Sequence, residues 1–186
     1  MAKRTGKSGR RSAGRKAVRA RSRARRPAKV APVPPLYGSV TPHLVTRDCA
    51  RALEWYGKAL GAKELLRMPG PGGKIMHAEM KIGDSVVMLS DEFPEQGARS
   101  PQTLGGCHGG VMLYVKDVDD TFRRALDAGA HTLMEPQDMF WGDRYGKLED
   151  PFGHYWGVAT AKEKVSPKEM QRRLAAMEQQ QPPPQG

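Results

Sequence analysis

The sequence repeats one pattern of elements after about 70 residues. Residues 44–48, Leu-Val-Thr-Arg-Asp, align with residues 113–117, Leu-Tyr-Val-Lys-Asp, at an offset of 69 positions. The pair Ile-Gly at 82–83 aligns with Phe-Gly at 152–153 at an offset of 70. An offset that holds to within one residue across two separate features indicates an internal duplication. We therefore expect two copies of one structural module.

The first copy is predicted to have the order βαβββ. Asp48 is a helix cap and Gly61 a helix stop, and the apolar residues between them recur at helical spacing. Gly83 and Asp84 form a two-residue hairpin turn between two alternating segments. The strands predicted around these signals are residues 39–46, 62–68, 74–82 and 85–90.

The second copy follows the same order, with a helix over 118–128 that Asp117 caps and Gly129 ends. Its predicted strands are 111–116, 131–135, 145–149 and 154–159. The fold class is therefore α+β, with modules at 38–92 and 109–161 inside a domain at 38–163.

Residues 164–186 are predicted as a helix and a Pro-rich end. A capping box starts this helix at Ser166, and its apolar stripe is expected to pack on the domain or on a second subunit; the stripe consists of Met170, Leu174 and Met177.

The net charge of +11 is concentrated at the N-terminus. Residues 1–30 hold thirteen Lys and Arg and no acidic residue, which leaves 18 basic and 20 acidic residues elsewhere. Residues 1–37 are predicted to be a disordered tail because they have almost no large apolar side chain to bury. Three interpretations stay open: an electrostatic nucleic-acid arm, a solvated extension without a partner, and an organelle transit peptide.

No apolar run approaches eighteen residues, so no membrane-spanning segment is predicted. The two cysteines, Cys49 and Cys107, do not make a disulfide framework. The expected location is the reducing cytoplasm, with organelle targeting by the basic tail as the alternative.

Residues 139–156 combine two Trp, two Tyr and two Phe with charged side chains. Ligand pockets often have this composition, because aromatic faces bury ligand area while a few polar groups fix its orientation. The alternative interpretation is that these aromatic residues only fill a sheet core. The candidate ligand-binding residues in this stretch are Trp141, Arg144, Tyr145, His154 and Trp156.

The two βαβββ modules, the helix sequence at 48–62 and the Glu-Asp-Pro-Phe-Gly-His-Tyr-Trp turn at 149–156 resemble the vicinal oxygen chelate superfamily. This superfamily contains glyoxalase I, bleomycin-resistance proteins and extradiol dioxygenases. Residues 77–79, 89–92 and 140–144 are similar to its PhnB-like, or YdcG-like, subgroup. The resemblance implies a cupped sheet with the ligand on its concave side, and a homodimer as a frequent state.

The resemblance also implies where a divalent ion would bind. The usual ligand positions fall on Thr41, Gly110 and Gly157, which carry no imidazole or carboxylate. The ordinary site is therefore expected to be absent, and no cofactor is predicted. A displaced divalent-metal site is the alternative, and its candidate ligands are His43, His77, Glu79, His108 and Glu149. Otherwise these groups hydrogen-bond one another or water.

Three functions follow as hypotheses. The first is metal-independent binding of a small organic molecule, with His43 and His77 added to the candidate ligand contacts. The second is a metal-dependent lyase or isomerase of glyoxalase type, in which Glu79 or Glu149 moves a proton. The third is association with nucleic acid through residues 1–30, whose charge attracts polyanions without sequence specificity.

Overall fold

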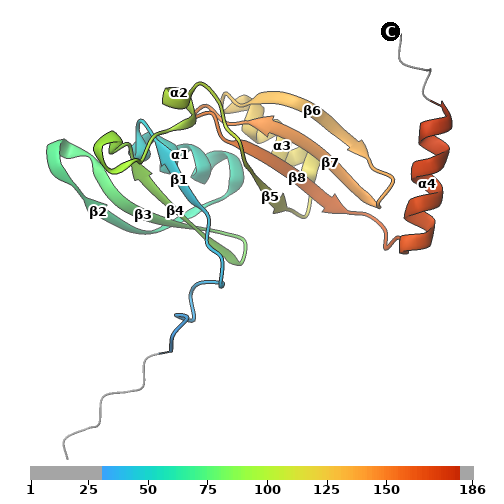
Figure 1. Cartoon of the computed structure of the whole chain (residues 1–186), viewed down its shortest axis with the longest axis horizontal. Coiled ribbons are helices and arrows are strands. Elements are labelled where there is room, and N and C mark those ends of the chain that lie inside the picture. Colours follow the sequence, from blue (N-terminus) through green and yellow to red (C-terminus); the bar gives the residue numbers. More distant parts are fainter. Residues whose placement is uncertain (1–30, 181–186) are drawn as a thin grey trace, which may run out of the picture. The chain divides into compact units, whose positions relative to one another are not determined.

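The computed structural model describes residues 31–180, with the side chains of Glu178 and Gln180 excepted. The predictions for residues 1–30 and for the Pro-rich end lie outside these residues. Figure 1 shows two sheets, each with its own helix, followed by a C-terminal helix. The fold is α+β, as the duplication predicts. Among the described residues, no helix is both long and apolar enough to cross a membrane.

The first module contains the helix α1 (Cys49–Leu60) between the first two of its four strands. Asp48 caps α1 by accepting a hydrogen bond from the Arg51 amide at 3.0 Å. Gly61 ends it in the left-handed conformation, with φ of 69°, which favours glycine. The structure confirms both predicted signals, the cap at Asp48 and the stop at Gly61. The strands are β1 (His43–Thr46), β2 (Lys63–Pro69), β3 (Ile75–Ile82) and β4 (Ser85–Asp91).

The second module has the same order around helix α3 (Val118–Asp127). Asp117 caps α3 through the Asp120 amide at 3.0 Å, and Gly129 follows the helix with φ of 97°. The turn before the last strand closes as expected, because the Gly153 amide donates to the Asp150 carbonyl at 3.0 Å. The strands are β5 (Gly110–Tyr114), β6 (His131–Asp138), β7 (Asp143–Glu149) and β8 (Tyr155–Ala161).

The sheet orders are equivalent. The first sheet runs β1-β4-β3-β2 and the second runs β5-β8-β7-β6. In each, the strand before the helix pairs in parallel with the last strand of the module, and the remaining pairs are antiparallel. Identical order and pairing in both halves confirm the internal duplication.

The two modules share one core. Helices α1 and α3 contact each other, and the Trp55 indole of α1 donates to the Ala128 carbonyl after α3 at 2.9 Å. Phe152, from the β7–β8 turn, packs edge-on against Trp55 with ring centroids 6.3 Å apart. The helix-covered faces of both sheets therefore belong to a continuous set of buried side chains.

Three regions differ from the prediction. The strand β1 begins at His43, whereas the sequence predicts a strand from residue 39. The segment between the modules contains the short helix α2 (Pro101–Leu104), which Ser100 caps. Two 3₁₀ turns are also present, at Pro71–Gly73 between β2 and β3 and at Pro94–Gln96 after β4. The strand β6 is longer than predicted, since it continues through Pro136 at an edge where proline costs no sheet hydrogen bond.

The last helix, α4 (Pro167–Gln180), begins as the capping box predicts, with the Glu169 amide donating to Ser166 Oγ at 3.2 Å. Leu174 and Met177 are 40% and 45% exposed, so most of the predicted apolar stripe is not covered within this chain. An ion pair between Arg173 and Glu163 joins the helix to the segment that follows β8.

Candidate functional site

Each sheet has one face covered by helices and one open face. In the first sheet, Leu44, Ala78, Met80 and Leu89 point to the helix side and are buried. Side chains alternate along a strand, so their neighbours form the open face. Strand register places Met88 between His43 and Glu79 in one row, with Leu66 beyond Glu79. We call the set His43, Val45, Leu66, Met68, His77, Glu79, Met88 and Ser90 the first open face.

A hydrogen-bonded carboxylate lies in the first open face. Glu79 Oε1 accepts from the Tyr37 hydroxyl at 2.7 Å and lies 3.1 Å from His77 Nε2. The hydrogen bonds from Tyr37 and His77 outweigh burial, and they hold the pKa of Glu79 below its usual value. Glu79 is therefore an ionised acceptor at neutral pH, although its side chain is nearly buried.

His43 and His77 come together from different strands, with ring centroids 6.5 Å apart. Burial, followed by the charge of His77, lowers the pKa of His43. The structure thus brings three of the predicted residues, His43, His77 and Glu79, close together. The fourth contact, Tyr37, could not be predicted, because it lies before β1 and only the folded chain brings it to β3.

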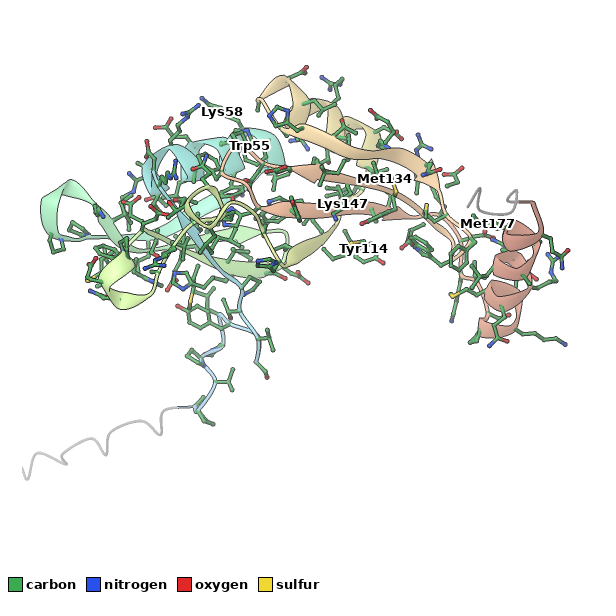
Figure 2. The ribbon with its side chains drawn as sticks, turned by 45° about the horizontal axis from the view of Figure 1, so that its top comes forward. Trp55, Lys58, Tyr114, Met134, Lys147 and Met177 are labelled. Atoms are coloured by element: carbon green, nitrogen blue, oxygen red, sulfur yellow. The ribbon has the colours of Figure 1, made fainter. Side chains whose placement is uncertain are left out.

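The second open face follows from the same alternation. Strand register aligns Gly110 with Tyr155, Tyr114 with Ala159, Tyr145 with Ala159, and Lys147 with Gly157. Glu149 faces Tyr155 in the neighbouring strand. We call the set Gly110, Met112, Tyr114, Asp143, Tyr145, Lys147, Glu149, Tyr155 and Gly157 the second open face. Figure 2 labels Tyr114 and Lys147 on the strands of this sheet.

Aromatic side chains surround one carboxylate on the second open face. Asp143 Oδ2 accepts from the Tyr114 hydroxyl at 2.8 Å and from the Trp141 indole at 3.1 Å. The Trp141 ring lies 5.9 Å from that of Tyr145. The hydrogen bond to Asp143 raises the pKa of Tyr114, which is 61% exposed and therefore open to a ligand. Amphipathic aromatic side chains in this arrangement can stack on a ligand while their polar ends remain paired.

A cation stands beside this aromatic group. Lys147 Nζ lies 4.8 Å from the centroid of the Tyr155 ring, which is cation–π distance. Tyr114, Asp143, Lys147 and Tyr155 were not among the predicted site residues. For two of them the sequence carried a usable signal, since Asp143 and Lys147 share strand parity with Tyr145 on β7.

Gly157 explains why a metal does not fit the usual position in this module. A Cβ at residue 157 would lie 2.8 Å from Tyr145 Cε2 and 2.9 Å from Met112 Sδ. The Tyr145 ring therefore lies against the backbone of β8, in the space that a ligating side chain would need. Thr41 and Gly110 supply no imidazole or carboxylate either. The residues present at the three usual positions do not fit a divalent ion.

The alternative metal ligands are divided among separate places. His43, His77 and Glu79 belong to the first open face, and Glu149 belongs to the second. His108 is exposed in the loop before β5.

Three predicted ligand contacts are placed on the helix side instead, which corrects the expectation. Trp156 has no exposed surface and donates to Asp150 at 2.9 Å. His154 is 6% exposed, and its Nδ1 lies 3.6 Å from the same carboxylate. Arg144 forms two 2.8 Å hydrogen bonds with Asp119 of α3. Trp156 and His154 are thus structural, and Arg144 is already engaged in an ion pair.

The family model described as "Glyoxalase/Bleomycin resistance protein/Dioxygenase superfamily" matches residues 38–158. The chain belongs to this superfamily. An uncharacterised protein of Mycobacterium tuberculosis is 45% identical over 141 residues, which cover 74% of this chain and 83% of the relative. The anthracycline biosynthesis protein DnrV of Streptomyces peucetius is 33% identical over 137 residues, which cover 73% of this chain and 45% of DnrV.

Solved structures of the superfamily share the fold. The crystal structure of TioX from Micromonospora sp. ML1 superposes with a TM-score of 0.51 at 33% identity, and covers 67% of this chain and 99% of TioX. All three of these relatives, the Mycobacterium tuberculosis protein, DnrV and TioX, are more than 30% identical to the present chain.

Proposed function

We propose that this superfamily member binds a small, partly aromatic organic molecule on the second open face, without the usual divalent ion. The observation that carries the proposal is the position of Tyr145, whose ring fills the space at Gly157. The same residue supplies aromatic surface beside Trp141. A ligand-binding face therefore stands where metal-dependent relatives place a ligating side chain.

The chemistry of the second open face describes the ligand. Tyr114, Trp141, Tyr145 and Tyr155 offer aromatic surface, and Lys147 offers a positive charge beside it. Asp143 is occupied by two donors, so Glu149 is the carboxylate left to recognise a cationic or hydroxyl group. Planar molecules with an anionic or phenolic group suit this arrangement. The name of DnrV makes an anthracycline a sensible first probe.

The site is proposed to be completed by a second copy of the chain. Leu66 and Met68 on the first open face are 42% and 41% exposed, and Met112 and Tyr114 on the second are 47% and 61% exposed. Apolar side chains exposed together on a sheet face mark an interaction or ligand surface. A homodimer in which the first open face of one copy covers the second of its partner would bury both. Membership of the PhnB-like subgroup is proposed on the resemblance of residues 77–79, 89–92 and 140–144 to that subgroup.

Tryptophan fluorescence tests the proposal. Trp55 and Trp156 are 7% and 0% exposed, whereas Trp141 is half-buried on the site, so Trp141 reports ligand there. Titration with an anthracycline is expected to quench emission saturably, and Trp141→Phe is expected to remove that change. The quenching is expected to persist in excess EDTA.

Matched variants place the ligand. Lys147→Met and Tyr145→Ala are each expected to weaken binding of the anthracycline by about tenfold, as expected for the loss of one cationic or aromatic contact. Lys58→Met is the control, because Lys58 is exposed on α1 at the helix side, as Figure 2 shows. Equal effects of Lys58→Met and Lys147→Met would place the ligand elsewhere.

A further inference from the structure

The Tyr37 hydroxyl joins the segment before β1 to the first open face through its hydrogen bond to Glu79. Residues 31–40 are exposed at every position except Tyr37, which is half-buried. A turn precedes the contact, because the Tyr37 amide donates to the Pro34 carbonyl at 3.0 Å. Val33, Leu36 and Val40 are apolar but 47%, 47% and 87% exposed, so they do not anchor the segment. We call residues 33–40 the strap.

The strap is held to a site that has the composition of a ligand pocket. The Tyr37 hydroxyl donates to Glu79 at 2.7 Å, and the same carboxylate oxygen lies near His77. Leu66 and Met88 flank Glu79 in register on the strands to either side. An ionised acceptor surrounded by apolar side chains and an imidazole suits an aromatic ring that carries one hydrogen-bond donor.

We propose that Tyr37 is an internal stand-in for the ligand: its phenol occupies Glu79 in the free protein, and a phenolic ligand displaces it and releases the strap. In the proposed homodimer the first open face of one copy covers the second open face of its partner, so the inference rests on the proposed function and adds two things to it. It names the functional group that the first open face recognises, a phenol. It also makes the strap a regulatory element, because ligand and Tyr37 compete for one carboxylate.

Competition has a measurable consequence. A ligand's apparent affinity equals its intrinsic affinity multiplied by the fraction of molecules in which its site is open. Removing Tyr37 opens the site in every molecule, so affinity for a phenol rises. A hydrogen bond to a charged group corresponds to roughly tenfold or more in such an equilibrium, and we expect Tyr37→Ala to bind a phenol about tenfold more tightly than the parent protein.

The first arm of the test needs no ligand. Hydrogen exchange of the peptide covering the strap is measured by mass spectrometry in the full chain, in Tyr37→Ala and in Tyr37→Phe. Both variants are expected to speed exchange in the strap, while Val40→Ala, which changes an exposed residue of the same segment, is expected to leave it unchanged. Tyr37 lies outside the core, so these variants keep the fold. Unchanged exchange in Tyr37→Ala would overturn the proposal.

The second arm uses p-cresol as the probe, with its Kd measured by ligand-observed NMR. We expect tighter binding in Tyr37→Ala, loss of that gain in the double variant Tyr37→Ala with Glu79→Gln, and faster strap exchange when p-cresol is added to the parent protein. Equal Kd values in parent and Tyr37→Ala, absence of binding to Tyr37→Ala, or indifference to Glu79→Gln would each overturn the inference. The Trp141 titration decides the proposed function separately, because it reads the second open face.

Discussion

Tyr56 of α1 donates a hydrogen bond of 2.6 Å to Asp150 in the turn between β7 and β8, and so joins the helix of one module to the hairpin of the other. Asp150 also accepts from the Trp156 indole and from the amides of Phe152 and His154, each at 2.9 Å. Both Tyr56 and Asp150 are almost fully buried. A satisfied buried network of this kind fixes the relative position of the elements that it joins.

Tyr56→Phe is expected to lower the free energy of unfolding by about 2 kcal/mol, because Asp150 loses a donor while remaining buried and charged. Urea unfolding monitored by circular dichroism measures the change. Tyr155→Phe is a matched control on the open face, where loss of a surface hydroxyl should cost less than about 0.5 kcal/mol. Equal costs for the two variants would contradict the role of this hydrogen bond.

Asp150→Asn is expected to remove a pH-dependent part of the stability. Burial acts to raise the pKa of Asp150, but His154, Tyr56 and Trp156 outweigh it and hold the pKa below the usual value. A lowered folded pKa stabilises the protein above the unfolded value of about 3.9, and that stability is lost as pH falls through the folded pKa. The parent and variant unfolding free energies should therefore differ at pH 7 and converge as the pH falls through the folded pKa of Asp150. A difference independent of pH would show that Asp150 is not the ionised partner.

Gly157→Ala is expected to displace Tyr145 from β8, since the new methyl group would come within 2.8 Å of its ring. The ends of Tyr145 and Met112 can move aside, so the stability cost should stay near 1 kcal/mol. Affinity for the anthracycline probe should fall about fivefold, as expected for the loss of one aromatic contact. Gly109→Ala is the control, because nothing lies within 4 Å of its Cβ position.

The two thiols are expected to react at different rates. Cys49 is fully buried, and burial followed by the charge of Asp91 raises the pKa of its thiol to about 12. Cys107 is half-buried in the loop before β5. In native protein, Ellman's reagent should therefore modify one thiol quickly, and peptide mapping should assign it to Cys107. Rapid modification of Cys49 without denaturant would contradict the packing at the start of α1.

Most of the fold could be predicted from local signals. Helix caps, helix stops and tight turns fix backbone geometry through a few neighbouring residues, so they can be recognised without tertiary information. Examples are the caps Asp48 and Asp117, the stop Gly61 and the turn Asp150–Gly153. The duplication then assigned the same order to both halves. The short helix α2 was missed because four residues carry little periodicity.

The site was harder to predict, because it depends on which face of each strand is open. Tyr155 and Trp156 are adjacent aromatics, and the sequence does not say which of them points to the helix side. The buried Trp156 indole is held on the helix side by its hydrogen bond to Asp150. These residues are six positions apart, and the bond forms only when the hairpin forms. Tyr37 has no local signal at all, since its partner Glu79 is 42 positions away.

Calorimetric titration of chelator-treated protein with the anthracycline probe, in EDTA and again with Mn²⁺, Ni²⁺, Co²⁺ or Zn²⁺ present, tests the central claim most directly. If Tyr145 occupies the space of a metal-ligating side chain at Gly157, binding needs no divalent ion. The Kd of the anthracycline should then agree within about twofold under all conditions. The same titration of Gly157→Ala should show weaker binding. Binding that appears only with a divalent ion, with about one ion bound per chain, would contradict the account and favour a metal-dependent enzyme.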